Sequence, residues 1–412
     1  IDRIWIGLVG TDSLAALGVA HAVLMICINS IMGPAIGTLA GVARSIGSGD
    51  HKQAISYVSQ GMMIASILGV FFMAGAFWVP EPVMAFMDTS PSVTDPATTY
   101  LRISMLGLVI HAPLFVLTFA IQGSGDARTA LKVQTIAPLV NAILDPILIF
   151  GFDMGLAGAA WATVFANLVS LIIGIFFFAR TDLWTQTRDR FLGFNASVAR
   201  RVVAVGVPGT LEQLVRTVAL FLVLKILAPF GAPVLAGYTT MIMVVMFMIF
   251  PGLALGQATA TMVGQNLGAQ NFDRAWKTIW ASTAIYLSFM LVAALGIYFS
   301  AEFLVSIFDR NPEVIAQGSQ LLRTMMFAFP GLAVAVILSK AFGGAGKTVP
   351  PMISSSLAHV VFQVVAASYW ADTYGVQGAY WAISLAFVVH GAFNLLMCLY
   401  FLRPSRLRRL GT

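Results

Sequence analysis

Long apolar runs dominate the chain, and short polar or glycine- and proline-containing connections separate them. The runs are continuous and do not alternate with a period of two, so they predict transmembrane helices and not the strands of a β-barrel. Eleven runs are long enough to cross a bilayer, which takes roughly 20 residues. These predicted spans are 14–46, 53–79, 99–122, 129–151, 156–179, 201–229, 233–267, 273–300, 317–342, 349–371 and 376–402.

A further apolar run, 1–10, is about half as long as a spanning helix needs to be. It ends at Gly10, and the chain starts with Ile1 instead of Met. We expect this run to be the end of a first transmembrane helix whose front is missing from the sequence. The predicted fold is therefore an all-α polytopic membrane protein with twelve transmembrane helices, the first of them truncated.

Composition and charge support this prediction. Of the 412 residues, 59% are hydrophobic and only 10% are charged, whereas a soluble domain carries about 25% charged residues. The net charge of +6 does not indicate a nucleic-acid partner, because Lys and Arg occur mainly in the short connections. Cys27 and Cys398 both lie inside apolar runs, which argues against a disulfide framework or a metal knuckle.

Lys and Arg are concentrated in every second connection, and this asymmetry predicts which connections face the cytoplasm. Arginines are concentrated in the connection 180–201, at Arg180, Arg188, Arg190, Arg200 and Arg201, and in the tail after residue 402. The intervening connections are acidic or neutral, with Arg102, Arg310 and Arg323 as exceptions. We expect a multi-pass protein of the cell membrane with both termini and this connection in the cytoplasm.

Several short motifs recur later in the chain at an almost constant spacing. An even number of helices per repeat makes the two halves parallel, as in transporters whose repeat axis follows the membrane normal. We therefore predict two pseudo-symmetric six-helix lobes, 1–180 and 201–412, joined by a cytoplasmic linker, 181–200, around a central cavity. The motifs are 14–17 with 235–238, Gly47 with Gly268, and 123–125 with 344–346, all 221 residues apart, and 155–161 with 375–381, 220 apart.

Asp145 is the first candidate for chemistry, because an ionisable residue within a span is costly and is a functional hypothesis by default. Asn141 is four residues earlier and shares its helix face, and Pro146 frees a backbone carbonyl one turn back. A carboxylate, an amide oxygen and a free carbonyl form an oxygen-rich site that suits Na⁺. A buried carboxylate would equally suit a proton.

Depth in the membrane places two more residues beside Asp145. The expected distances from the outer boundary are about 9 Å for Asp145, about 12 Å for Asp2 and about 10 Å for Thr163. The alternative is that each is a lone polar residue satisfied by its neighbours, and Thr is common in such helices.

The repeat argues for a functional site. At a spacing of 221, Asp145 corresponds to Ala366 and Asn141 to Phe362, so the carboxylate belongs to the first half only. A structural polar pair would be expected in both halves. An asymmetric site for a coupling ion is the better interpretation.

The second half offers weaker candidates. Glu212 and Arg216 are four residues apart and either neutralise each other or line the cavity. Met243 and Met246 belong to a Met-rich run that indicates core packing or an adaptable substrate surface. The histidines form no metal-binding spacing, and we interpret those within spans as hydrogen-bonded packing residues: His21, His111, His359 and His390.

In combination, several motifs resemble the multidrug and toxic compound extrusion (MATE) transporters over essentially the whole chain. The similarity is strongest to the branch that includes DNA-damage-inducible-protein-F-like members. The start at 1–7 with 14–18 resembles the end of that family's first helix, 123–129 and 141–146 resemble its fourth and fifth helices, and Pro251 with 264–269 resembles its eighth.

The resemblance implies two six-helix lobes and antiport of a drug against Na⁺ or H⁺. It also implies that the coupling-ion site consists of Asp2, Asn141, Asp145 and Thr163, in agreement with the depth argument. Other branches carry a Glu on the seventh helix about two turns after its Pro. Here Glu212 follows Pro208 by one turn, so that role is not transferred.

We therefore expect a secondary antiporter, not an enzyme, that exports cationic or amphipathic compounds by rocking alternating access. It should act as a monomer in the bilayer, without a cofactor. The alternative is a flippase for lipid-linked saccharides or lipids. An anionic cargo of that kind would call for several cationic residues in the cavity, and only Arg3, Arg216 and Lys225 lie deep in the spans.

Overall fold

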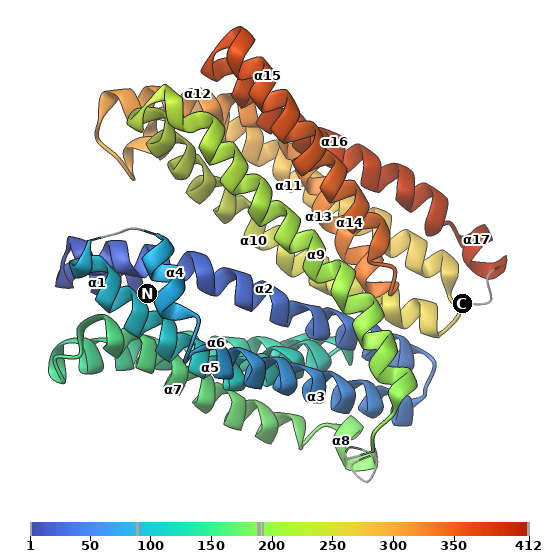
Figure 1. The fold of residues 1–412 in the computed structure, drawn as a ribbon. Helices are drawn as coiled ribbons and strands as arrows, with labels where there is room; N and C mark the ends of the chain where they lie inside the picture. Colours follow the sequence, from blue (N-terminus) through green and yellow to red (C-terminus); the bar gives the residue numbers. More distant parts are fainter. Residues whose placement is uncertain (1, 88–89, 188–190, 192, 410–412) are drawn as a thin grey trace. The chain divides into compact units, whose positions relative to one another are not determined.

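The computed structural model describes residues 2–87, 90–187, 191 and 193–409, and nearly all of them are helical (Figure 1). The chain divides into two compact units, Ile1–Thr210 (unit 1) and Leu211–Thr412 (unit 2). The division falls inside helix α9, Ala196–Leu227. The predicted linker 181–200 contains the short helix α8 (Asp182–Thr187) and the start of α9, while its Arg188 and Arg190 lie outside the described residues.

Unit 1 is a bundle of long helices running alongside one another (Figure 1). The short helix α4 comes before α5 and was not predicted. A π-helical turn, η1, continues α6. The elements before α9 are α1 (Asp2–Val9), α2 (Thr11–Gly47), α3 (His51–Gly75), α4 (Pro80–Phe86), α5 (Pro91–Gly123), α6 (Ala127–Pro146), η1 (Ile147–Gly151), α7 (Gly155–Phe178) and α8.

Unit 2 follows the same plan after α9. Its fifth helix is interrupted in the middle by a π-helical segment, η4 (Ser356–Gln363), and a 3₁₀ turn, η3 (Ala228–Phe230), ends α9. The other elements are α10 (Ala232–Gly268), α11 (Phe272–Ser306), α12 (Pro312–Met325), α13 (Phe329–Gly344), α14 (Val349–Ser355), α15 (Val364–Tyr374), α16 (Val376–Phe401) and α17 (Pro404–Arg409).

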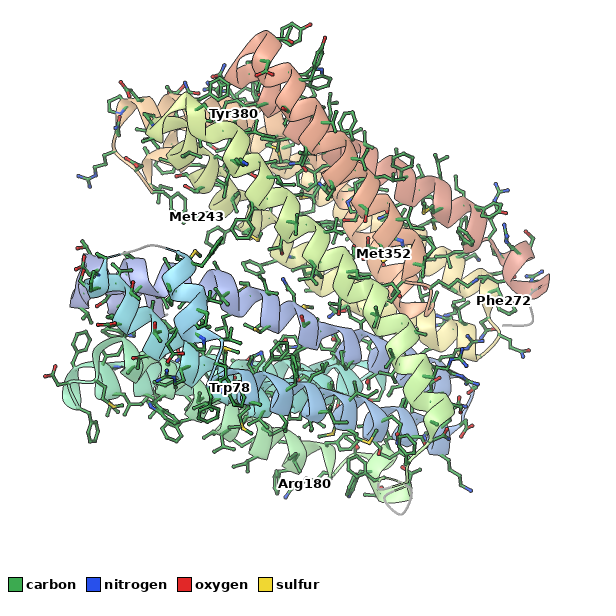
Figure 2. The ribbon with its side chains drawn as sticks, viewed as in Figure 1. Trp78, Arg180, Met243, Phe272, Met352 and Tyr380 are labelled. Carbon is green, nitrogen blue, oxygen red and sulfur yellow. The ribbon has the colours of Figure 1, made fainter. Side chains whose placement is uncertain are left out.

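Length and hydropathy identify the spans. Among the described residues, 10 helices are long and apolar enough to cross a membrane, or up to 11 if α12 and α13, bent by 63°, count as one span. Nitrogen and oxygen atoms gather towards the helix ends, whereas carbon dominates along the helix lengths (Figure 2). The polytopic all-α fold is therefore confirmed, including the absence of strands from the described part of the chain.

The internal repeat holds element by element. Helices α2 and α10 both have 37 residues, and their first and last residues are 221 apart. Helix α5 spans the same register as α12 and α13 together. Even the left-handed turn residues coincide at this spacing, at Gly10 and Gly231, Gly49 and Gln270, and Gly125 and Gly346.

One ion pair occurs twice in the repeat. Arg102 pairs with Glu81 in unit 1, and Arg323 pairs with Glu302 in unit 2. All four residues are equivalent at the spacing of 221. Two of the three arginines that break the charge pattern of the connections are thus neutralised locally.

A close helix contact also occurs twice. A Cβ atom on Gly123 would lie 2.9 Å from the carbonyl oxygen of Leu39, and one on Gly344 would overlap the carbonyl oxygen of Ala260. Neither position has room for a side chain, because the obstacle is backbone. These glycines, which lie in the recurring 123–125 and 344–346 motifs, let α5 pack directly on α2 in unit 1 and α13 pack directly on α10 in unit 2.

Candidate functional site

Three helices of unit 1 place four polar side chains in one hydrogen-bonded chain. Asn141 of α6 donates from Nδ2 to Asp145 Oδ1 at 3.1 Å and to Thr163 Oγ1 of α7 at 3.2 Å. The Thr163 hydroxyl in turn donates to Asp2 Oδ2 of α1 at 3.4 Å. The structure therefore brings together the three residues that the sequence placed at one depth, Asp2, Asp145 and Thr163, and Asn141, which shares a helix face with Asp145.

Burial gives this chain its electrostatic character. Asp145 is completely buried, Asn141 is 7% exposed, and Asp2 and Thr163 are partly buried. No donor among the described residues reaches Asp145 Oδ2. The carboxylates of Asp2 and Asp145 act electrostatically on each other. Two carboxylates that share a buried site favour a bound proton or cation between them, because their charges repel.

Local backbone features aim these groups at one another. Pro146 has no N–H, so it leaves the carbonyl of Ala142, one turn back, without its usual helical donor. The chain then continues as the π-helical turn η1, a feature that is frequent at functional sites. A Cβ on Gly158 of α7 would lie 2.7 Å from the backbone of Leu148 in η1, and this close approach brings Thr163 towards α6.

This arrangement can hold a small cation. The oxygens of Asp2 and Asp145, together with the Asn141 amide oxygen and the Thr163 hydroxyl, are hard donors of the kind that Na⁺ prefers. Among the described residues, no group of three or more His, Cys, Asp or Glu side chains could hold a metal ion. Because all donors of Asp2, Asn141, Asp145 and Thr163 that could face an ion are oxygens, the set suits a hard cation or a proton better than a transition metal.

In unit 2, Glu212 and Arg216 do not form the pair that their spacing suggested. Arg216 donates to Gln213, and within the described part of the chain it makes no ion pair with Glu212. Glu212 is buried, and both charges act on Lys340 of α13. The aliphatic stem of Lys340 packs against Gly256.

The Met-rich run of α10 has two faces. Met241 is buried in the core of unit 2, with Val244 and Val245. Met243 and Met246 are 41% and 46% exposed on the unit. These two side chains are therefore not part of the buried core.

Unit 2 also contains a buried polar network that was interpreted from the sequence only as packing. It joins His359 and Gln363 of η4 to His390 and Asn394 of α16. In each helix the two residues are four apart, as Asn141 and Asp145 are, so the same spacing argument could have identified them.

Comparison with known proteins places this architecture among transporters. The model of the MatE family matches residues 1–147 and 208–368. The probable multidrug resistance protein YpnP of Bacillus subtilis is 25% identical over 94% of this chain and 87% of its own length. The FAD transporter of Shewanella oneidensis is 22% identical over 95% of this chain and 87% of its own.

The fold matches solved structures closely. A MOP superfamily transporter from Pyrococcus furiosus superposes with a TM-score of 0.92, covering 99% of this chain and 91% of that chain at 24% identity. The structure of that protein was described as having a binding pocket of reverse polarity, which suggested a different function. At this identity the similarity concerns the fold.

Proposed function

The chain belongs to the MatE family of multi-pass membrane transporters, and on that premise we propose that it is a secondary antiporter. It exports cationic or amphipathic compounds in exchange for Na⁺ or H⁺ by alternating access. The relative YpnP is described as a probable multidrug resistance protein, which supports this substrate class. In this proposal the protein works as a monomer in the cell membrane, with both termini in the cytoplasm.

The coupling ion binds at Asp2, Asn141, Asp145 and Thr163 in this proposal. Without an ion, the two carboxylates repel each other, and no donor from the described part of the chain reaches Asp145 Oδ2. A proton on one carboxylate, or Na⁺ between them, removes that repulsion and ties α1 to α6 and α7. Binding thereby changes the packing of unit 1, and this change is coupled to release of the substrate.

One observation carries the proposal: three hydrogen bonds link two acidic side chains from distant parts of the sequence through Asn141 and Thr163. A site that served only packing would not require two carboxylates in the apolar interior, because each costs several kcal/mol there unless it is neutralised.

Transport in proteoliposomes tests the proposal. The wild-type protein should export a fluorescent cationic dye when a Na⁺ gradient or a pH gradient is applied separately, and the active gradient identifies the ion. Asp145→Asn keeps the size of the side chain and removes its charge, and it should reduce ion-driven export about tenfold or more. The exposed pair residue Glu302→Gln is the matched control and should transport normally. Unchanged export by Asp145→Asn would remove the proposed coupling site.

A second candidate function is the transport of an anionic cargo, including flipping of a lipid or lipid-linked saccharide. Arg216 and Lys340 support it, because they place two positive charges against the single negative charge of Glu212 in unit 2. The relative from Shewanella oneidensis is an FAD transporter, and FAD is anionic. Uptake of FAD and of the cationic dye by the same proteoliposomes distinguishes the two candidates.

A further inference from the structure

The polar network of unit 2 is a continuous chain of hydrogen bonds across two helices. His359 Nδ1 lies 2.7 Å from Gln363 Oε1, and His359 Nε2 lies 3.2 Å from His390 Nδ1. His390 Nε2 lies 3.4 Å from Asn394 Nδ2. All four side chains are buried, and Asn394 is fully buried.

The orientation of Asn394 fixes the direction of this chain. Its Nδ2 donates to the Ala335 carbonyl at 3.1 Å and to the Ser339 hydroxyl at 3.0 Å, and its Oδ1 accepts from Ser354. The backbone carbonyl can only accept, so the nitrogen of the amide must face it. The two Nδ2 hydrogens are shared among these two oxygens and His390 Nε2. An amide nitrogen cannot accept, so His390 Nε2 can only act as an acceptor at this contact.

One tautomer of each histidine follows from that orientation. Since His390 Nε2 accepts, its proton is on Nδ1 and is donated to His359 Nε2. Since His359 Nε2 then also accepts, its proton is on Nδ1 and is donated to Gln363 Oε1. Both rings are neutral, and each of their four nitrogens has a partner of the right kind.

An additional proton has no place in this arrangement. On His359 Nε2 it would face the N–H of His390, and on His390 Nε2 it would face the amide of Asn394. In either case two donors would oppose each other in a buried site, where unsatisfied polar groups are costly. Proton binding therefore requires η4 and α16 to separate at this point.

The charged groups around the network also disfavour a positive charge on the two histidine rings. Arg216 of α9 acts electrostatically on both rings, and its charge opposes a second positive charge. Lys340 of α13 is next to Ser339 and is itself influenced by Arg216 and Glu212. The titratable group of α16 that faces His359 is His390 itself. Asp372 on α15 is about 20 Å along the helix from His359, too far to act on the pair directly.

The network belongs to unit 2 only. At a spacing of 221, His359 and Gln363 correspond to Pro138 and Ala142. At the spacing of 220 that holds for the last helix of each unit, His390 and Asn394 correspond to Ser170 and Gly174. In unit 1, Ser170 simply donates to the Val133 carbonyl. A network required for packing of the shared fold would be expected in both units.

We propose that the His359–His390 pair is a proton-binding site of this protein, separate from the site at Asp145, and that it takes up one proton when η4 moves away from α16. The new bond is an N–H bond on His359 Nε2 or His390 Nε2, and the proton comes from water. The π-helical geometry of η4 makes this movement local, because a π segment converts to an α-helix by shifting its hydrogen bonds by one residue.

Ring nitrogen NMR tests this site directly. The protein is labelled with ¹⁵N-histidine, purified through a tag without histidine, and carries His21→Gln, His51→Gln and His111→Gln, so that only the proposed pair gives signals. At about pH 8 both rings should be neutral with the proton on Nδ1. Towards about pH 5, one ring should become an imidazolium. An Nε2–H tautomer or a charged ring at about pH 8 would overturn the proposal, as would two rings that stay neutral at about pH 5.

A near-isosteric substitution provides a second measurement. Asn394→Asp replaces the donor that faces His390 Nε2 with a carboxylate, so the pair should take up its proton about one pH unit higher or more. Asn167→Asp makes the same change in unit 1 and should leave the midpoint unchanged. Equal midpoints for Asn394→Asp and the parent protein would contradict the proposal. These signals are independent of transport, so they stand or fall separately from the proposed antiport at Asp145.

Discussion

The hydroxyl of Thr163 lies 3.4 Å from the carboxylate of Asp2, although 161 residues separate them in the chain. This contact closes a chain of hydrogen bonds that starts at the buried Asp145 and passes through Asn141. Three helices of unit 1 are thereby joined through groups that bind cations. An ion at this point would act on the packing of all three.

The Thr163 hydroxyl should contribute affinity for the coupling ion. Thr163→Val keeps the shape of the side chain and removes one oxygen and one hydrogen bond, worth about 1 kcal/mol. We expect the ion concentration for half-maximal transport to rise about fivefold, with the maximal rate little changed. Thr118→Val is the control, because among the described residues that buried hydroxyl bonds only to a carbonyl of its own helix, at Leu114. Equal effects of both variants would argue against Thr163 as an ion ligand.

The close helix contact at Gly344 should dominate local stability in unit 2. Gly344→Ala puts a methyl group against the Ala260 carbonyl, and overpacking of this kind costs about 1–3 kcal/mol or more. Gly296→Ala has open space around it and should be neutral or slightly stabilising. Thermal unfolding of both variants in the same detergent measures the difference. A Gly344→Ala protein as stable as Gly296→Ala would mean that the two helices are not in contact there.

The repeated ion pairs should contribute little to stability. Arg102 and Arg323 are each 40% exposed, and their acidic partners are more exposed still. Exposed pairs typically contribute about 0–1 kcal/mol, so Arg323→Gln should lower the free energy of unfolding by less than about 1 kcal/mol. Denaturation at low and high salt measures it, and a loss several times larger would show that the pair is shielded from solvent.

The same ion pairs provide a test of orientation. If both termini are cytoplasmic, Glu81→Cys and Glu302→Cys should react with a membrane-impermeant maleimide added outside intact cells. Asn271→Cys, in the connection before α11, should react only after the membrane is opened. Both native cysteines are buried, so background labelling should be low. The opposite labelling pattern would reverse the proposed topology.

Spans and repeat could be predicted from the sequence because both depend on local composition and spacing. Asp2, Asp145 and Thr163 could be grouped because depth along a helix is a simple function of residue number. Asn141 joined them because it is four residues from Asp145 on the same helix face. The bend of 63° between α12 and α13 was not predicted, although Pro330 and Gly331 follow the break directly and Pro330 lies in the first turn of α13. The angle itself is not encoded in such a signal.

Side-chain partners were harder to predict than positions. The spacing of Glu212 and Arg216 suggested an ion pair, yet the Arg216 guanidinium donates to the Gln213 side chain instead. On a helix, a residue three positions away is as accessible as one four positions away. The network of His359 and His390 was missed as a unit because it joins two helices. Only the four-residue spacing within each helix was visible in the sequence.

Direct measurement of cation binding to the purified protein tests the central claim. Radioactive ²²Na⁺ binding and proton release or uptake should be measured on the wild type, Asp145→Asn and the control Glu302→Gln. The wild type and the control should bind one Na⁺ or exchange one proton at the Asp145 site, and Asp145→Asn should lose that binding. Equal binding by Asp145→Asn and the wild type would contradict a cation site at Asp2, Asn141, Asp145 and Thr163.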